Sequence, residues 1–268
     1  MIKVLHRRLA RTCSAVALIL IGLVVGNVSR GARPALQNSN SLPQEQTKIP
    51  YKPVGNEATL SGRITFVGDP PRVLQIDTSA DPSCSGKGRL PTEHAAIVNG
   101  MVANVFVYVK GLALEKLVFE APSSPAVLDQ RRCRFVPHVM GIQTGQTLMI
   151  TNSDPTQHNI HPTPKNNAEF NMTQPSGAEA IVKQFSRPEI MVPFKCNQHP
   201  WMKAYVGVLS HPFFAVTDKN GFYSISGLPP GTYTVVAWHE RFGERTADVT
   251  VAPYESRSLD FDFQDRPN

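Results

Sequence analysis

The chain has 268 residues, with 27 Lys or Arg and 21 Asp or Glu, for a formal net charge of +6. Residues 1–33 carry six basic side chains and no acidic one, so the remainder is formally neutral and shows no cluster of Lys and Arg. Nucleic acid is therefore excluded as an expected partner, because a phosphate-binding surface needs such a cluster. The Gly and Pro residues are spread along the chain, which is typical of a turn-rich β protein.

The N-terminus has the pattern of a targeting segment. Basic residues from Lys3 to Arg11 precede an apolar run over residues 15–28, which is typical of a secretory signal or of a membrane anchor. The run is shorter than the ~20 residues that span a bilayer comfortably, and no small-x-small cleavage site follows it. We expect residues 1–33 to direct export to the periplasm or the cell surface, as a signal peptide or as an uncleaved anchor.

Residues 34–57 are polar and have no hydrophobic period, so they predict a flexible linker. Apolar and polar residues alternate from Leu60 to Phe66, which predicts a strand. A second strand is predicted over residues 102–110, with Val105, Val107 and Val109 on one face and Phe106 and Tyr108 on the other. Further strands are predicted at 147–152, 191–196 and 205–209, and no stretch has a sustained helical period.

Two segments in the middle of the chain carry side chains that suit a soft metal. The first is His158-Asn159, and the second runs Cys-Asn-Gln-His-Pro-Trp-Met from Cys196 to Met202. Together they offer one thiolate, two imidazoles and one thioether, which is the ligand set of a blue-copper site. A single thiolate with an axial methionine favours copper over zinc.

These segments resemble a known family. Residues 144–154 (TGQTLMITNSD) and the C-x-x-H-x-x-M loop are similar to the cupredoxins of the amicyanin and plastocyanin branch. The resemblance implies that His158, Cys196 and His199 are equatorial copper ligands and that Met202 is the axial one. It also implies that Asn159 forms hydrogen bonds to the ligand loop and the thiolate.

By the same resemblance, the protein is expected to hold one type 1 copper and to exchange single electrons with a redox-protein donor and acceptor. Trp201 and Pro193 are expected to add apolar surface around an exposed edge of His199, where a partner docks. No H-E-x-x-H, G-x-S-x-G or Walker loop is present in the sequence, so we expect no enzyme activity. A copper storage or delivery module and an extracellular carbohydrate- or protein-binding module are the alternatives.

The last third of the chain contains a second recognisable pattern. Asn220-Gly221 lies between apolar runs and predicts a hairpin, and residues 227–233 (GLPPGTY) predict a turn that leads into a strand over 232–238. Strands over 246–251 and 259–263 follow. This stretch resembles the carboxypeptidase regulatory-like domain, a transthyretin-like sandwich, whose first strands resemble residues 60–64 and 105–109.

The two resemblances together predict an all-β protein. Residues 58–121 and 213–265 are expected to form the transthyretin-like, immunoglobulin-like sandwich. Residues 122–212 are expected to form the cupredoxin sandwich inserted into it, and two sequential domains are the alternative.

Four cysteines are present. Cys13 lies in the targeting segment and Cys196 in the metal motif, which leaves Cys84 and Cys133. In an exported protein a disulfide between them is expected. A second metal site that uses both cysteines with His94 and His138 is the alternative.

Overall fold

The computed structural model describes residues 48–79, 81–85 and 90–265. The predicted targeting segment, 1–33, and residues 34–47 of the predicted linker lie outside the described residues. The described chain is nearly all β, which confirms the predicted fold class. Its helices are two single turns, α1 (Pro82–Ser85) and α2 (Leu112–Glu115). Among the described residues, no helix has the length and apolar character needed to cross a membrane.

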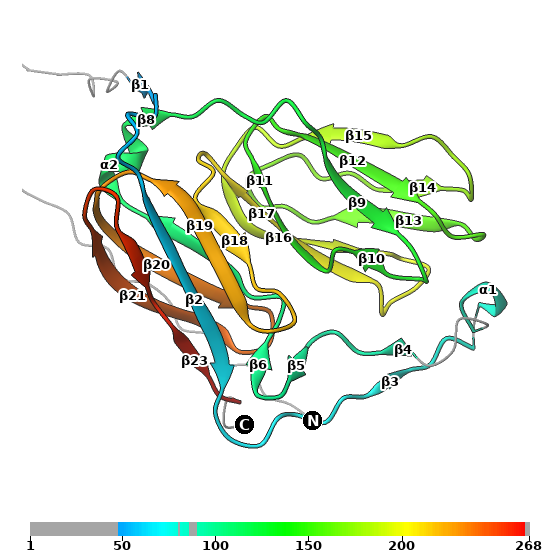
Figure 1. The fold of residues 1–268 in the computed structure, drawn as a ribbon. Coiled ribbons are helices and arrows are strands. Elements are labelled where there is room, and N and C mark those ends of the chain that lie inside the picture. The colour runs from blue at the N-terminus through cyan, green and yellow to red at the C-terminus, as the bar shows by residue number, and fades with distance from the viewer. Residues whose placement is uncertain (1–47, 80, 86–89, 266–268) are drawn as a thin grey trace, which may run out of the picture. The chain divides into compact units, whose positions relative to one another are not determined.

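One sandwich, here called the split sandwich, is built from strands at both ends of the described chain (Figure 1). Its first sheet has the order β18 (Phe214–Val216), β7 (Phe106–Lys110), β20 (Gly231–His239) and β21 (Gly243–Val251). Its second sheet has the order β19 (Phe222–Leu228), β2 (Ala58–Phe66), β6 (Met101–Val102) and β5 (Ile97–Val98). The short strands β22 (Ser256–Ser258) and β23 (Phe261–Phe263) also pair with β2. Because β7 pairs with β18 and β20, and β2 with β19, segments far apart in the sequence share each sheet.

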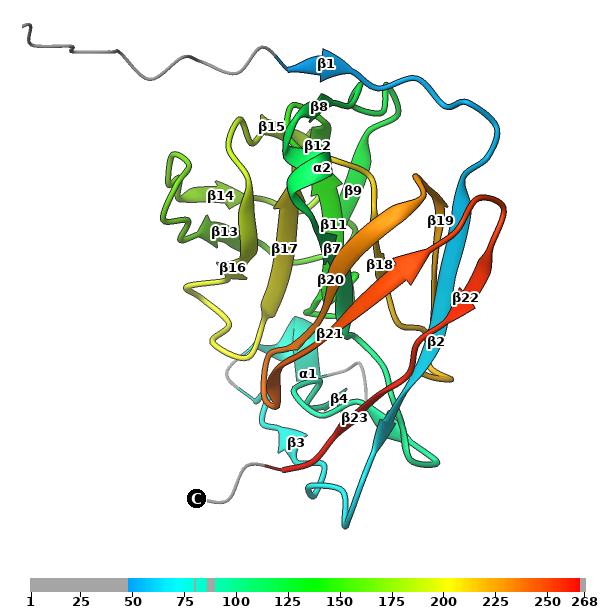
Figure 2. The ribbon, with the colours of Figure 1, turned by 90° about the vertical axis from the view of Figure 1, so that its left-hand side faces the viewer.

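The second sandwich, here called the central sandwich, is built from the strands between them (Figures 1 and 2). One sheet has the order β10 (Phe135–Val136), β9 (Ala126–Gln130), β12 (Thr147–Asn152) and β15 (Ile181–Gln184). The other has the order β11 (Val139–Gln143), β17 (Lys203–Leu209), β16 (Glu189–Lys195), β13 (His158–Pro162) and β14 (Met172–Gln174). Buried side chains from both sheets, such as Leu148 and Val206, form one core.

The strand predicted over residues 102–110 is two strands. Asn104 has a φ of 61°, and the chain crosses there from β6 in one sheet of the split sandwich to β7 in the other. The hydroxyl of Thr217 bridges the break, because it accepts from the Val105 N–H at 3.0 Å and donates to the Val102 carbonyl at 2.8 Å. The two predicted faces of β7 are present: its valines lie in the core of the split sandwich, and Phe106 and Tyr108 lie in a separate cluster.

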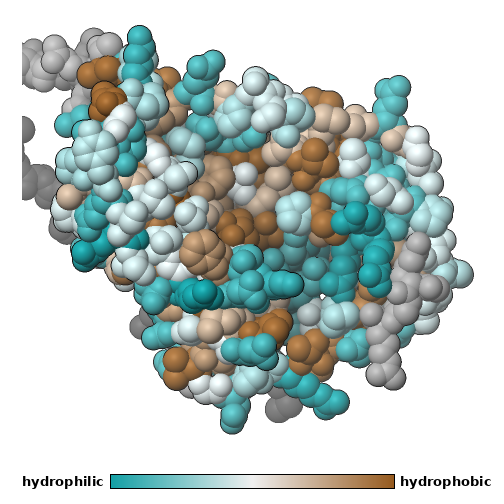
Figure 3. All heavy atoms as spheres, in the orientation of Figure 1, coloured by the Kyte–Doolittle hydropathy of each residue, from teal (hydrophilic) through white to brown (hydrophobic). Residues whose placement is uncertain are grey.

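That separate cluster joins the two sandwiches. Phe106, Tyr108 and Val236 of the split sandwich are buried against Val139, Met191 and Leu209 of the central one. Figure 3 shows apolar residues gathered near the middle of one face, where Figure 1 places β18 and β11, with polar residues over most of the rest. Burial of this apolar surface stabilises the contact between the sandwiches.

The described part of the predicted linker contains a short strand. β1 (Ile49–Pro50) pairs in parallel with β8 (Leu117–Val118), and the ring of Tyr51 lies 4.9 Å from that of Phe119. The described residues of this stretch thus include a short paired strand that was not predicted, while the flexible linker over residues 34–57 stays a prediction. Backbone pairing of this kind is not visible in a stretch that lacks hydrophobic alternation.

A long excursion leaves the split sandwich after β2 and returns at β5 (Figure 1). It carries β3 (Gln75–Ile76), α1 and β4 (Leu90–Pro91). Cys84 of α1 is bonded to Cys133 of the central sandwich. The predicted disulfide is thus confirmed, and it rules out the alternative metal site, because the two sulfur atoms are bonded to each other.

Candidate metal centre

The fold brings three of the predicted ligands together, from the start of one strand of the central sandwich and from the loop that follows its neighbour. His158 is the first residue of β13, and Cys196 follows the last residue of β16. These strands are antiparallel neighbours, with His161 opposite Lys195. The loop from Cys196 to Met202 is closed by hydrogen bonds from the Met202 N–H to the His199 carbonyl (2.8 Å) and from the Cys196 N–H to the Met202 carbonyl (3.2 Å). The loop is therefore shaped by its own backbone.

The ligand atoms of three residues converge. The Nδ1 atoms of His158 and His199 lie 2.9 Å apart, and Cys196 Sγ lies 3.7 Å from Nδ1 of His199. All three groups could hold one metal ion, since their ligand atoms lie within 4.8 Å of one another. The three residues are 0–4% exposed. Met202 is 1% exposed and belongs to the same apolar core as Cys196.

Each imidazole forms a hydrogen bond through its Nε2 to a carboxylate. Nε2 of His158 lies 3.0 Å from Asp154 Oδ2, and Nε2 of His199 lies 2.9 Å from Asp81 Oδ2. Burial raises the pKa of both carboxyl groups, but the hydrogen bonds that they accept outweigh burial and lower each pKa below its ordinary value. Both groups are therefore charged acceptors, and each Nε2 carries the proton that it donates. This is the usual arrangement behind a metal-bound histidine.

The protonation of the cluster follows from these contacts. Burial lowers the pKa of His158, but Asp154 and Cys196 outweigh it and raise this pKa to about 9. Burial raises the pKa of the Cys196 thiol, but His158 and backbone N–H groups lower it further than burial raises it. The pKa of His199 is lowered below its ordinary value, and burial is the largest cause. Asp154 and Cys196 thus both favour the protonated form of His158, and His158 in turn favours the thiolate form of Cys196.

Asn159 contacts both the thiolate and the ligand loop. Its backbone N–H donates to Cys196 Sγ at 3.3 Å, and its side-chain Oδ1 accepts from the Asn197 N–H at 3.1 Å. Its Nδ2 donates to Asn171 at 2.6 Å and to the Met172 carbonyl at 3.2 Å. One residue thus connects the first-ligand strand, the thiolate and the ligand loop.

The exposed edge expected for His199 is not present, and that prediction is wrong. The ring is 4% exposed because Asp81 and α1 cover its Nε2 edge, where Cys84 Sγ also lies 3.9 Å from Nε2. Trp201 packs 5.1 Å from the ring and donates its indole N–H to the Cys133 carbonyl at 3.0 Å. Neither carboxylate was predicted from the sequence. Asp154 precedes His158 by four residues, which is a usable signal, whereas Asp81 is 118 residues from its histidine.

Comparison with known proteins found one match to a family model. Residues 198–264 match the family model of the carboxypeptidase regulatory-like domain. The match starts inside the ligand loop and includes β17, which pairs in this structure with β11 and β16 of the central sandwich. No curated protein matches the sequence.

Among solved structures, an amicyanin from Paracoccus versutus is 18% identical over 33% of this chain and 85% of its own, with a TM-score of 0.29. A mutant of amicyanin in its reduced state is 20% identical over 33% of this chain and 86% of its own, again with a TM-score of 0.29. A copper-containing nitrite reductase from Thermus scotoductus is 15% identical over 54% of this chain and 28% of its own, with a TM-score of 0.30.

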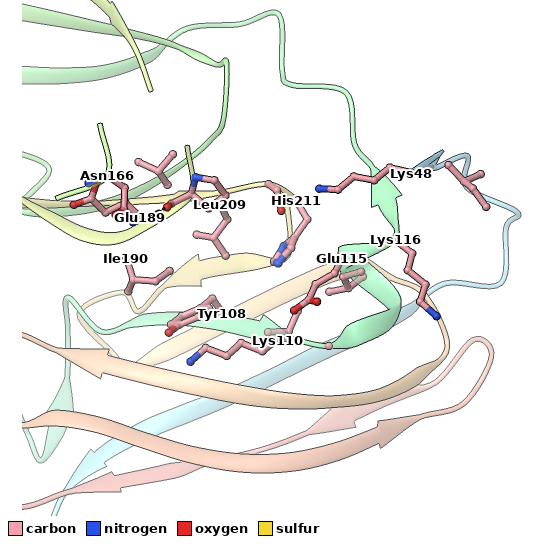
Figure 4. A pocket seen from close by; sticks show the side chains of 17 residues that line it. Lys48, Tyr108, Lys110, Glu115, Lys116, Asn166, Glu189, Ile190, Leu209 and His211 are labelled. Carbon is pink, nitrogen blue, oxygen red and sulfur yellow. Dashed lines mark hydrogen bonds between the residues drawn. The ribbon is translucent and has the colours of Figure 1, made fainter. Parts of the chain in front are cut away.

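A cavity of about 1140 Å³ lies between the sandwiches, away from the candidate ligands. Figure 4 shows Lys48, Lys110 and Glu115 reaching toward it, and Ile190 and His211 also line it. Its lining therefore carries both signs of charge. Burial lowers the pKa of His211 to about 4, so this imidazole is neutral at pH 7. None of the residues that line this cavity is one of the candidate metal ligands.

Proposed function

We propose that the chain is an exported mononuclear type 1 copper protein that carries single electrons between a redox-protein donor and a redox-protein acceptor. One observation carries the proposal: the two Nδ1 atoms of His158 and His199 lie 2.9 Å apart while both Nε2 atoms face carboxylates. With their protons on Nε2, the imidazoles point two lone pairs at each other beside a thiolate. That arrangement is repulsive unless a cation lies between them. A metal ion is a cation that fits this donor set.

The donor set favours copper. Two imidazoles and one thiolate, with a methionine as weak axial ligand, suit copper, whereas structural zinc sites use four tetrahedral ligands that are mostly cysteine. His158, Cys196 and His199 would hold the ion, and Met202 is the proposed axial ligand. Copper bound there supplies a one-electron couple.

The residues around the ligands support electron transfer without bond-making chemistry. The three ligand side chains are buried, so the fold keeps water and substrates away from them. The ligand loop is closed by its own backbone hydrogen bonds, and Asn159 connects it to the thiolate. A site that is fixed in this way needs little rearrangement when its charge changes. We therefore propose that the protein is an electron carrier and not an enzyme.

Export is supported by two features. The basic and apolar N-terminal sequence has the pattern of a signal or an anchor, and the Cys84–Cys133 disulfide suits an oxidising compartment. We propose a periplasmic or cell-surface location. The split sandwich would then serve as a spacer or as a docking platform for redox partners.

The test is the optical and EPR spectrum of the protein loaded with Cu(II). We expect an intense blue thiolate-to-copper band that is lost in Cys196→Ser and in His158→Gln. His161→Gln is the matched control, because His161 lies on the same strand but contacts Glu169 and Asn197 instead of the other ligands. A protein that binds Cu(II) without this band, or keeps the band in Cys196→Ser, would contradict the proposal. A protein that holds only Cu(I) and stays colourless under oxidant would instead be a copper storage or delivery module.

A further inference from the structure

The candidate centre is closed by a part of the chain that lies outside the central sandwich. The excursion between β2 and β5 places Asp81 and α1 against the Nε2 edge of His199. The opposite edge of the ring faces His158 and the Cys196 thiolate. Both nitrogen atoms of His199 therefore have partners, and the ring has almost no contact with solvent.

Asp81 is itself held in a fixed orientation. Its Oδ1 accepts from the Ser83 N–H at 2.7 Å, and its Oδ2 accepts from the Thr156 hydroxyl at 3.1 Å as well as from His199. Its side chain is 19% exposed. Thr156 lies on the loop that leads to His158, so one carboxylate connects both ligand-bearing segments. A carboxylate fixed by two other donors orients the ring that donates to it.

The disulfide links this segment covalently to a residue beside the candidate centre. Cys84 is bonded to Cys133 across 49 positions of sequence. The Cys133 N–H donates to Asp154 Oδ2 at 2.7 Å, and the Cys133 carbonyl accepts from the indole of Trp201. The covalent link therefore joins the Asp81 segment to the carboxylate behind His158 and to the ligand loop. The cap segment is defined here as residues 81–85.

We propose that the cap segment belongs to the metal centre and contributes to its properties. Asp81 is the positioning residue of His199. The disulfide holds the segment over the edge of that ring, so that solvent and small external ligands do not reach it. This inference rests on the proposed copper function for its metal-dependent readouts only, since the contacts exist without the ion. A partner that exchanges electrons with the centre then meets the cap segment or Trp201 instead of the bare edge of His199.

The first test needs no metal. In the metal-free full chain, the Nε2–H proton of His199 is expected to give a slowly exchanging signal by NMR. Asp81→Ala should abolish that signal or accelerate its exchange at least tenfold. Asp81→Asn keeps the shape of the side chain and one acceptor oxygen, so its exchange rate should lie between those of the parent and of Asp81→Ala. This second variant keeps the test valid if Asp81→Ala fails to fold. Asp77→Asn is the matched control, because Asp77 lies in the same excursion, is exposed and accepts from the Ser79 N–H instead of from a histidine.

The second test uses the copper-loaded protein and an excess of chelator. Asp81→Ala is expected to lose copper 10–100-fold faster than the Asp77→Asn control, which is the usual effect of losing a residue behind a metal-bound histidine. A Cys84→Ser/Cys133→Ser double variant should lose copper faster as well, and should bind azide where the parent does not. Equal proton exchange and equal copper loss in Asp81→Ala and Asp77→Asn would overturn the proposal. If the parent binds no copper, the proposed function fails, but proton exchange still decides the role of Asp81.

Discussion

Glu240, on the turn between β20 and β21 of the split sandwich, forms a buried ion pair with His138, which directly precedes β11 of the central sandwich. The side chains are 11% and 6% exposed, respectively. Nδ1 of His138 donates to the Lys203 carbonyl at 2.9 Å, which leaves Nε2 for the carboxylate. This pair is a directional contact between the sandwiches, in contrast to the apolar cluster beside it.

Glu240→Gln should therefore lower the free energy of unfolding by about 1–3 kcal/mol, because it removes the closer counter-charge of a buried imidazole and leaves only Glu93, whose Oε2 lies 3.6 Å from Nδ1 of His138. Glu244→Gln, an exposed change on β21, is the control, and urea unfolding is the measurement. A loss no larger than that of the control would mean that the pair contributes nothing to stability.

The same pair predicts a pH window. Burial lowers the pKa of His138, but Glu240, together with Glu93 and the Lys203 carbonyl, outweighs it and raises this pKa above its ordinary value of 6.5. Burial raises the pKa of Glu240, but His138 lowers it below 4.5. The His138 contribution is fully present below pH 6.5 and is lost as the pH rises through the raised pKa. The Glu240 contribution is present above pH 4.5 and is lost as the pH falls through the lowered pKa. The difference in stability between the parent and Glu240→Gln should thus be largest between pH 4.5 and 6.5 and shrink on either side.

Gly207, in β17, allows the sandwiches to approach each other. A Cβ at this position would lie 2.5 Å from the ring of Phe106 and 2.6 Å from the end of Met191, so the ring must move. We expect Gly207→Ala to cost about 1–3 kcal/mol of stability, as overpacking does in other cores. Gly231→Ala is the control, because its added Cβ would meet only the far end of Tyr233, at 3.3 Å. Equal melting temperatures for the two variants would show that the interface adapts freely.

Local pattern explains which parts of the fold were predictable. Alternating residues predicted β2 and β12 because each has a buried face, and the C-x-x-H-x-x-M spacing found the ligand loop because a metal motif is local. The break at Asn104 was missed, although the spacing of three between Val102 and Val105 departs from the alternation of Val105, Val107 and Val109. Asp81 could not be found, because its role depends on an excursion that brings it to a histidine 118 positions away.

Asn159→Ala should loosen the ligand loop, because the Asn197 N–H then loses the acceptor that ties the loop to β13. The expected cost is about 1 kcal/mol of stability, together with at least tenfold weaker copper binding in a chelator competition. Asn171→Ala is the control, since Asn171 contacts the side chain of Asn159 but not the ligand loop. If both variants weaken copper binding equally, the tie between Asn159 and the loop has no special role.

The Met202→Leu variant tests whether Met202 is an axial ligand or only a core residue. Met202 is 1% exposed in an apolar core, and exchange of methionine for leucine usually costs less than about 1.5 kcal/mol, so the fold should be kept. If the thioether is the weak axial ligand, its loss removes electron donation that favours the oxidised ion, and the reduction potential should rise while the blue band remains. Spectroelectrochemistry of the copper-loaded variant measures this directly, with Met172→Leu as the control, because Met172 is partly exposed on β14. An unchanged potential would assign Met202 to packing alone and reduce the proposed ligand set to His158, Cys196 and His199.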